Sequence, residues 1–204
     1  MAAAAINGAL RRLPVWPVYV LGLLPLPWLF WQAATGGLGP DPVRALEHRY
    51  GELALQLLVG GLTVTPLRRL SGVSLLRFRR ALGLLAFAYV LAHVAVWLVL
   101  DVQRDLAAAW EDIAERPHIT MGLVAVLLLL PLAVSSTDRA LRRLGARRWR
   151  QLHRLVYPAA LAAALHPVML AKTWEAESLA YLAVILLLLL RLPLPAFRRR
   201  NRPS

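Results

Sequence analysis

The chain has 204 residues, of which 59% are hydrophobic, and its mean hydropathy is +0.56. A single soluble domain of this length cannot bury so much apolar surface, so the composition excludes a water-soluble globular protein and indicates an integral membrane protein. The sequence contains no cysteine, which excludes disulfides, thiolate-bound iron–sulfur clusters and covalently attached heme c.

Six apolar runs approach the twenty or so residues that a membrane-spanning helix needs. In chain order they cover about 14–31, 52–67, 81–100, 119–136, 155–171 and 178–194. The second run is short, so we expect it to tilt or to thin the bilayer. The sequence therefore predicts an all-α fold, a six-helix membrane bundle that forms one domain over residues 1–204.

Basic residues are unevenly distributed around these runs. Most of the 24 Lys and Arg residues lie at the N-terminus, after the second and fourth runs, and in the C-terminal tail. Of the 11 acidic residues, only Asp138 falls on the same side. Because cytoplasmic loops are enriched in Lys and Arg, we expect both termini in the cytoplasm. Anionic lipid headgroups then explain the net charge of +13, and no nucleic-acid partner is needed.

Two histidines, His93 and His166, lie inside the third and fifth apolar runs. Both runs point outward, and each histidine lies roughly 10 Å from the outer end of its run. A buried polar group without a partner costs about 1–3 kcal/mol, so two imidazoles at one depth indicate a use. These residues favour a heme between the two helices, with one axial nitrogen from each. The alternative is that each imidazole only hydrogen-bonds a neighbouring helix.

A third histidine, His153, lies at the inner end of the fifth run, about 20 Å before His166 along a helix. This interval is close to the spacing of two hemes across a membrane. Just before the third run, however, Arg80 and Arg79 occupy the positions 13 and 14 residues before His93, where a facing histidine would be needed. A second heme would need another ligand there. The alternatives are that His153 binds a quinone or a headgroup, or that it only caps the interface with Trp149 and Tyr157. His48 and His118 are expected to be solvated loop residues.

Several other functions lack sequence support. There is no glycine-rich phosphate loop, no HExxH motif and no Ser/His/Asp set, which argues against nucleotide hydrolysis and zinc proteolysis. A proton-coupled transporter would need carboxylates near the middle of the membrane, and Glu52 at the start of a run is the nearest candidate. A bare scaffold would need no histidine inside a span.

Six segments together carry a family resemblance. They are GGLGPDPV (36–43), HRYGELALQLL (48–58), VTPLRR (64–69), RRALGLLAFAYVLAH (79–93), RPHITMG (116–122) and LGARRWRQLHRLVYPAALAAALH (144–166). Over nearly its whole length the chain resembles the heme-binding membrane subunit of the bacterial periplasmic methionine sulfoxide reductase system, the MsrQ type. That family is similar to the transmembrane heme domains of ferric reductases and NADPH oxidases, without their flavin and NADPH domains.

The resemblance implies a function and a location in the bacterial inner membrane. Electrons would pass from the ubiquinone/quinol pool, through heme b and a bound FMN, to a periplasmic molybdopterin enzyme that reduces methionine sulfoxide in oxidised envelope proteins. The chain itself would oxidise quinol but would not reduce methionine sulfoxide. A transmembrane ferric or cupric reductase with another acceptor is the nearest alternative.

The resemblance also implies residue roles. His93 and His166 match the family's axial ligands of heme iron, and His153 matches its third intramembrane histidine. The chain departs from the family at His118, where an aromatic residue is usual, and at Pro167, where tyrosine is usual. We expect the partner to dock on the outer side, partly by charge, against the acidic loop 101–115 and its neighbours.

Overall fold

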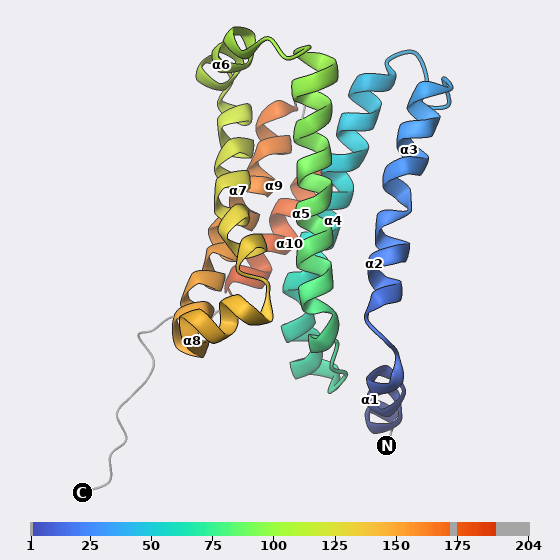
Figure 1. Ribbon diagram of the computed structural model, residues 1–204, viewed down its shortest axis with the longest axis vertical. Helices are drawn as coiled ribbons and strands as arrows, with labels where there is room; N and C mark the ends of the chain where they lie inside the picture. The colour runs from blue at the N-terminus through green and yellow to red at the C-terminus, as the bar shows by residue number, and fades with distance from the viewer. Residues whose placement is uncertain (1, 172–174, 191–204) are drawn as a thin grey trace, which may run out of the picture.

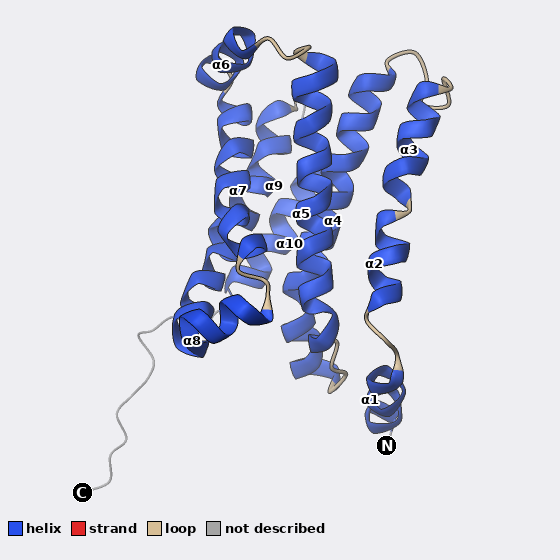
Figure 2. Cartoon of the chain, in the orientation of Figure 1, coloured by secondary structure: helices blue, strands red, loops and turns tan. Residues whose placement is uncertain are grey.

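The computed structural model describes residues 2–171 and 175–190 of the chain. Within these residues the regular structure is helical and contains no strand (Figure 2). The predicted all-α fold is confirmed. Most of the long helices run side by side along the length of the molecule, and the N-terminal helix α1 (Ala2–Arg12) extends from one end (Figure 1).

The first predicted helix is in fact two helices, α2 (Trp16–Leu23) and α3 (Pro25–Ala34). The break follows from Pro25 and Pro27, which have no amide hydrogen to donate within a helix. Two tyrosines attach this broken helix to the bundle. The hydroxyl of Tyr50 donates to the carbonyl of Leu26 at 2.6 Å, and that of Tyr89 donates to the carbonyl of Gly22 at 2.7 Å.

The second predicted helix is much longer than the expected 52–67. Helix α4 spans Pro42–Ser71, because Asp41 caps its first turn and Gly72, with φ of 73°, ends it in the left-handed conformation. The turns near both ends of α4 contain charged residues, so a search for apolar runs cannot find them. The correction matters for function, because these extra turns carry residues that contact His93.

The third and fourth predicted helices are α5 (Arg79–Val96), extended by a π-helical segment (Trp97–Asp101), and α7 (Pro117–Val134). Between them lies α6 (Leu106–Glu115), where a loop was expected. This short helix forms because the Asp105 carboxylate accepts hydrogen bonds from the amides of Ala107 and Ala108. The acidic residues expected on a loop are therefore presented by a helix.

The basic segment after α7 is also a helix rather than the expected loop. Helix α8 (Asp138–Leu152) bends at Gly145, whose φ is 73°, and lies across one end of the bundle (Figure 1). A 3₁₀ turn at His153–Leu155 leads into α9 (Val156–Leu170), and α10 (Ala176–Leu190) follows. Residues 191–194 of the sixth predicted run lie outside the described residues.

The centre of the bundle forms where α4, α5, α7, α9 and α10 meet. Helix α4 packs along α5, α7 packs along α9, and α10 covers α9 and α4. The alanines of α9 are small enough for close helix approach. The buried hydrophobic cluster at the centre of the bundle consists of Leu55, Leu58, Leu62, Ala86, Leu129, Ala159, Ala160, Ala164 and Ile185.

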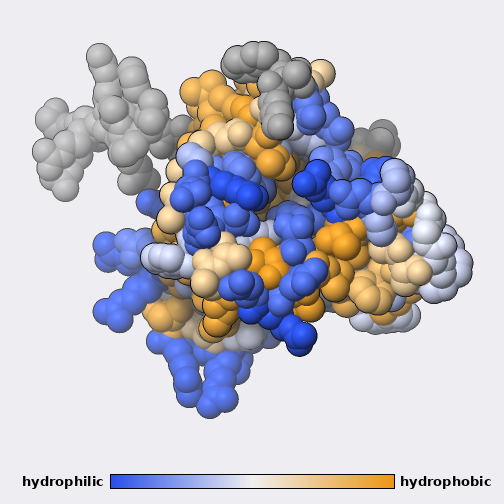
Figure 3. Space-filling view, turned by 90° about the horizontal axis from the view of Figure 1, so that it is seen from above, coloured by the Kyte–Doolittle hydropathy of each residue, from blue (hydrophilic) through white to orange (hydrophobic). Residues whose placement is uncertain are grey.

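Three helical segments among the described residues are long and apolar enough to cross a membrane: Trp16–Ala34, Leu76–Asp101 and Pro117–Val134. Leucine side chains on their outer faces, such as Leu91 and Leu127, are exposed. Hydrophilic residues cover much of the end of the molecule that carries α6, and hydrophobic patches show between and around them (Figure 3). Six crossings and cytoplasmic termini remain predictions.

Candidate functional site

The structure brings His93 of α5 and His166 of α9 together. Their ring centroids are 6.0 Å apart and the ring planes are nearly perpendicular, at 84°. Both side chains are half-buried. The sequence placed the two histidines at one depth, and the packing of the helices turns their rings toward one another.

Each imidazole is held by a backbone carbonyl of a neighbouring helix. Nδ1 of His93 lies 2.9 Å from the carbonyl oxygen of Glu47 on α4, and Nδ1 of His166 lies 2.6 Å from that of His118 on α7. A carbonyl oxygen only accepts, so Nδ1 must carry the hydrogen in both rings. Each Nε2 therefore has its lone pair available as a ligand.

Two glycines lie beside the Nδ1 and Cε1 atoms of these rings. A Cβ added to Gly51 on α4 would lie 3.2 Å from Nδ1 of His93, and one added to Gly122 on α7 would lie 3.1 Å from Nδ1 of His166. The sequence reasoning missed both residues. A signal did exist, because glycine within a helix costs about 1 kcal/mol relative to alanine and usually has a packing reason.

The expectation that His118 is a solvated loop residue is wrong. It lies in the first turn of α7 and is half-buried, with its ring centroid 5.9 Å from that of His166. Its backbone carbonyl, rather than its imidazole, forms the hydrogen bond with His166. Pro167 does not end the fifth predicted helix, because α9 continues to Leu170. His48 is exposed, as expected, but it lies in helix α4 rather than in a loop.

The pair His93 and His166 fits the iron of a heme. Two imidazoles that bind one metal from opposite sides, each at about 2 Å, would have centroids about 6 Å apart. No group of three or more His, Cys, Asp or Glu residues suited to a metal ion occurs in the part of the chain that the structure describes. Two protein ligands are too few for a bare ion, whereas a porphyrin supplies four nitrogens of its own.

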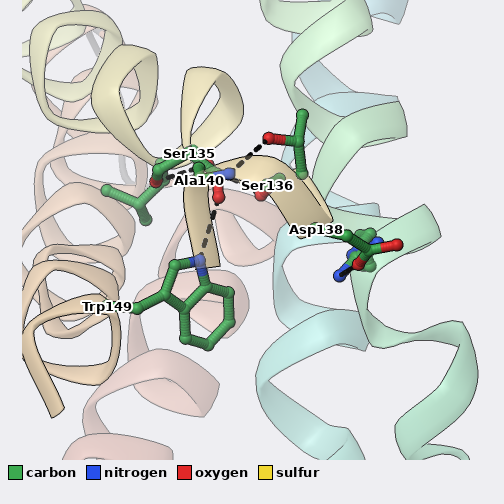
Figure 4. Close-up of polar contacts among 8 residues, drawn as sticks. Ser135, Ser136, Asp138, Ala140 and Trp149 are labelled. Carbon is green, nitrogen blue, oxygen red and sulfur yellow. Dashed lines mark hydrogen bonds and ion pairs between the residues drawn. The ribbon is translucent and has the colours of Figure 1, made fainter. Parts of the chain in front are cut away.

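His153 lies at the other end of the bundle, beside Ser135 and Trp149. Its ring stacks on Trp149 with centroids 3.8 Å apart, and its Nε2 lies 3.1 Å from Oγ of Ser135. The Trp149 indole N–H donates to the Ser135 carbonyl, as Figure 4 shows. Since the Ser135 hydroxyl donates to the carbonyl of Pro131 at 2.6 Å, it accepts from His153, and Nε2 carries the hydrogen there.

Arg79 and Arg80, at the start of α5, influence His153 through their positive charge. Burial and the positive charges of Arg79 and Arg80 lower the pKa of His153. Arg80 pairs with Asp138 at 2.7 Å, and its hydrogen bond and charge lower the pKa of that carboxyl. None of the other four histidines lies at this end, so the structure brings no second imidazole to face His153.

Glu52, the carboxylate that a transporter would use, does not stand alone. It accepts hydrogen bonds from Arg49, at 3.2 Å, and from Gln56, at 2.9 Å, both on the same helix. Gln56 also donates to the hydroxyl of Tyr181 on α10. These contacts make Glu52 part of an interhelical polar network.

Comparisons with known proteins identify the family of the chain. The family described as ferric reductase like transmembrane component matches residues 49–164. The chain is 45% identical to the protein-methionine-sulfoxide reductase heme-binding subunit MsrQ of Brucella anthropi, an alignment that covers 100% of this chain and 95% of the relative. Proteins of the same name from Brucella ovis and Brucella canis are 48% identical over 92% of this chain and 85% of their own length.

The family match covers more than half of the chain, and the Brucella anthropi relative aligns over nearly the full length of both proteins. The chain belongs to the ferric reductase like transmembrane family, and within it to the MsrQ type.

Proposed function

We propose that the chain is a membrane electron-transfer subunit that binds heme b between His93 and His166. The observation that carries this proposal is the imidazole pair itself, with centroids 6.0 Å apart and each Nδ1 bonded to a backbone carbonyl. The names of the relatives, which are heme-binding subunits, support it. The chain would act as one transmembrane heme-binding domain over residues 1–204.

The protein contributes orientation and burial. The carbonyls of Glu47 and His118 hold the Nδ1 protons, which fixes the rotation of each ring and makes Nε2 the ligating atom. Burial among α4, α5, α7 and α9 limits access of water to the pair. Bound heme would supply a one-electron centre whose potential depends on its ligands and on this burial.

We further propose that the electron donor is the quinol pool of a bacterial inner membrane and that the acceptor is a periplasmic molybdopterin-dependent methionine sulfoxide reductase. The relatives' name as subunits of a protein-methionine-sulfoxide reductase supports the acceptor. Both termini would be cytoplasmic. The histidine pair would then lie in the outer half of the membrane, near the end that carries α6.

The inner cluster of His153, Arg79 and Arg80 is proposed as the contact for a quinone or for the phosphate of FMN. Its positive charge suits an anionic or carbonyl-bearing ligand, because guanidinium groups bind both. A second heme would need a ligand other than histidine opposite His153. The arginine-rich helix α8 would lie against anionic lipid headgroups.

The proposal predicts which histidines a heme spectrum depends on. Purified protein should show sharp b-type bands in a dithionite-reduced-minus-oxidised spectrum. His93→Ala and His166→Ala should each abolish these bands or convert them to a high-spin form, because each removes one axial nitrogen. His153→Ala serves as the matched control and should retain the main bands. A wild-type protein that takes up no heme when heme is supplied would rule out the proposal.

A further inference from the structure

The two histidines are held by the same local arrangement on two different pairs of helices. His93 of α5 meets Glu47 and Gly51 of α4, and His166 of α9 meets His118 and Gly122 of α7. In both cases the accepting carbonyl lies one helical turn before the glycine. The helices differ in sequence and length, so the repetition points to a requirement of the imidazoles.

The geometry of an α-helix explains why glycine is needed one turn after the carbonyl. The amide of residue i+4 bonds to the carbonyl of residue i, and the side chain of residue i+4 begins beside that carbonyl. Serine and threonine at i+4 can even bond back to the carbonyl of residue i for this reason. A carbonyl oxygen has a second lone pair, which an imidazole from another helix can reach only if this position is open.

There is little space between the Cα atoms of Gly51 and Gly122 and the imidazoles of His93 and His166. A Cβ on Gly51 would lie 3.2 Å from Nδ1 and 3.4 Å from Cε1 of His93; on Gly122, the same two atoms of His166 would lie at 3.1 and 3.3 Å. Contacts this short require the neighbour to move by a few tenths of an ångström. In both histidines the edge of the ring formed by Nδ1 and Cε1 therefore packs against a glycine.

We propose that Gly51 and Gly122 are paired positioning residues. Because they lack a Cβ, they uncover the carbonyls of Glu47 and His118, so that each imidazole is anchored through Nδ1–H and presents Nε2 to the site. This inference rests on the proposed heme site. The glycines act through His93 and His166.

A methyl group at either glycine should weaken ligation in two measurable ways. Loss of a partner that orients a metal-ligating histidine typically lowers metal affinity 10- to 100-fold. A weaker Nδ1–H···O bond also makes the imidazole less basic, which stabilises ferric iron less and raises the midpoint potential. Both effects should appear in Gly51→Ala and in Gly122→Ala.

The chain offers matched controls. Gly60 lies on the same helix as Gly51, Gly83 lies on α5, and a Cβ on either would have no neighbour within 4 Å. We would measure transfer of heme from each variant to excess apomyoglobin, the electron paramagnetic resonance spectrum of the ferric protein and the midpoint potential. Gly51→Ala and Gly122→Ala should lose heme at least tenfold faster, whereas Gly60→Ala and Gly83→Ala should stay within twofold of wild type.

Each other outcome also decides the question. Wild-type heme retention, resonance spectrum and potential in both site variants would overturn the inference. The amount of each variant that accumulates in a heme-deficient host separates an effect on folding from an effect on heme ligation. If only Gly51→Ala and Gly122→Ala fail to accumulate there, the glycines serve the fold and the inference is again overturned. Absence of b-type bands from the wild type would instead refute the proposed function.

Discussion

At the residue scale, the two ends of the bundle hold their histidines differently. His93 and His166 donate through Nδ1 to backbone carbonyls, whereas His153 donates through Nε2 to Ser135. His93 and His166 therefore present Nε2, and His153 leaves Nδ1 as its accepting nitrogen. This difference in tautomer fits the different ligands that we propose for the histidine pair and for His153.

The ion pair of Arg80 with Asp138, at the same end of the bundle as His153, predicts that stability depends on pH. The pKa of Asp138 is lowered in the folded state, so the pair stabilises the protein above the carboxyl's unfolded pKa. That contribution is lost as pH falls through the folded pKa. Asp138→Asn should thus lower the melting temperature slightly at neutral pH. The difference from wild type should vanish in strong acid and in high salt, because both side chains are exposed.

At the element scale, the broken helix α2–α3 depends on two tyrosine hydroxyls for its polar attachment to the bundle. Tyr50→Phe and Tyr89→Phe each remove one hydrogen bond to a carbonyl of that helix, at a cost of about 1 kcal/mol. For a chain of this size each should lower the melting temperature by about 2–4 °C in detergent. Tyr19→Phe, on α2 itself, is the control. Equal melting temperatures for all three variants would refute this role.

At the scale of the whole molecule, we propose that the partner docks on the acidic surface of α6. Asp105 caps the helix and Asp112 pairs with Arg116 at 3.1 Å, whereas Glu111 and Glu115 are exposed one turn apart and form no ion pair within the described residues. Charge on this surface would speed association with a basic partner and would be screened by salt.

We therefore expect Glu111→Gln with Glu115→Gln to slow re-oxidation of the reduced chain by the methionine sulfoxide reductase several-fold at low ionic strength, and to reduce its dependence on salt. Asp138→Asn, at the opposite end, should have no such effect. Re-oxidation that is rapid with ferric citrate but absent with the sulfoxide reductase would favour the ferric reductase alternative.

Much of the fold follows from the sequence, but the limits of the helices do not. Apolar runs predicted the helical segments because bilayer thickness sets the length of a spanning helix. They missed the turns at the two ends of α4, because the capping residues Asp41 and Gly72, and not hydropathy, determine where this helix begins and ends. They also missed α6 and α8, which are polar on one side and form through local capping.

The sequence by itself determined the membrane class of the protein and the common depth of His93 and His166. Both properties follow from composition and from the rise along a single helix. Only the tertiary structure decided that the two rings face one another, which nitrogen of each carries the hydrogen, and that Gly51 and Gly122 lie beside them. These features depend on how each helix is rotated about its own axis against its neighbour, and on backbone carbonyls that every residue type possesses.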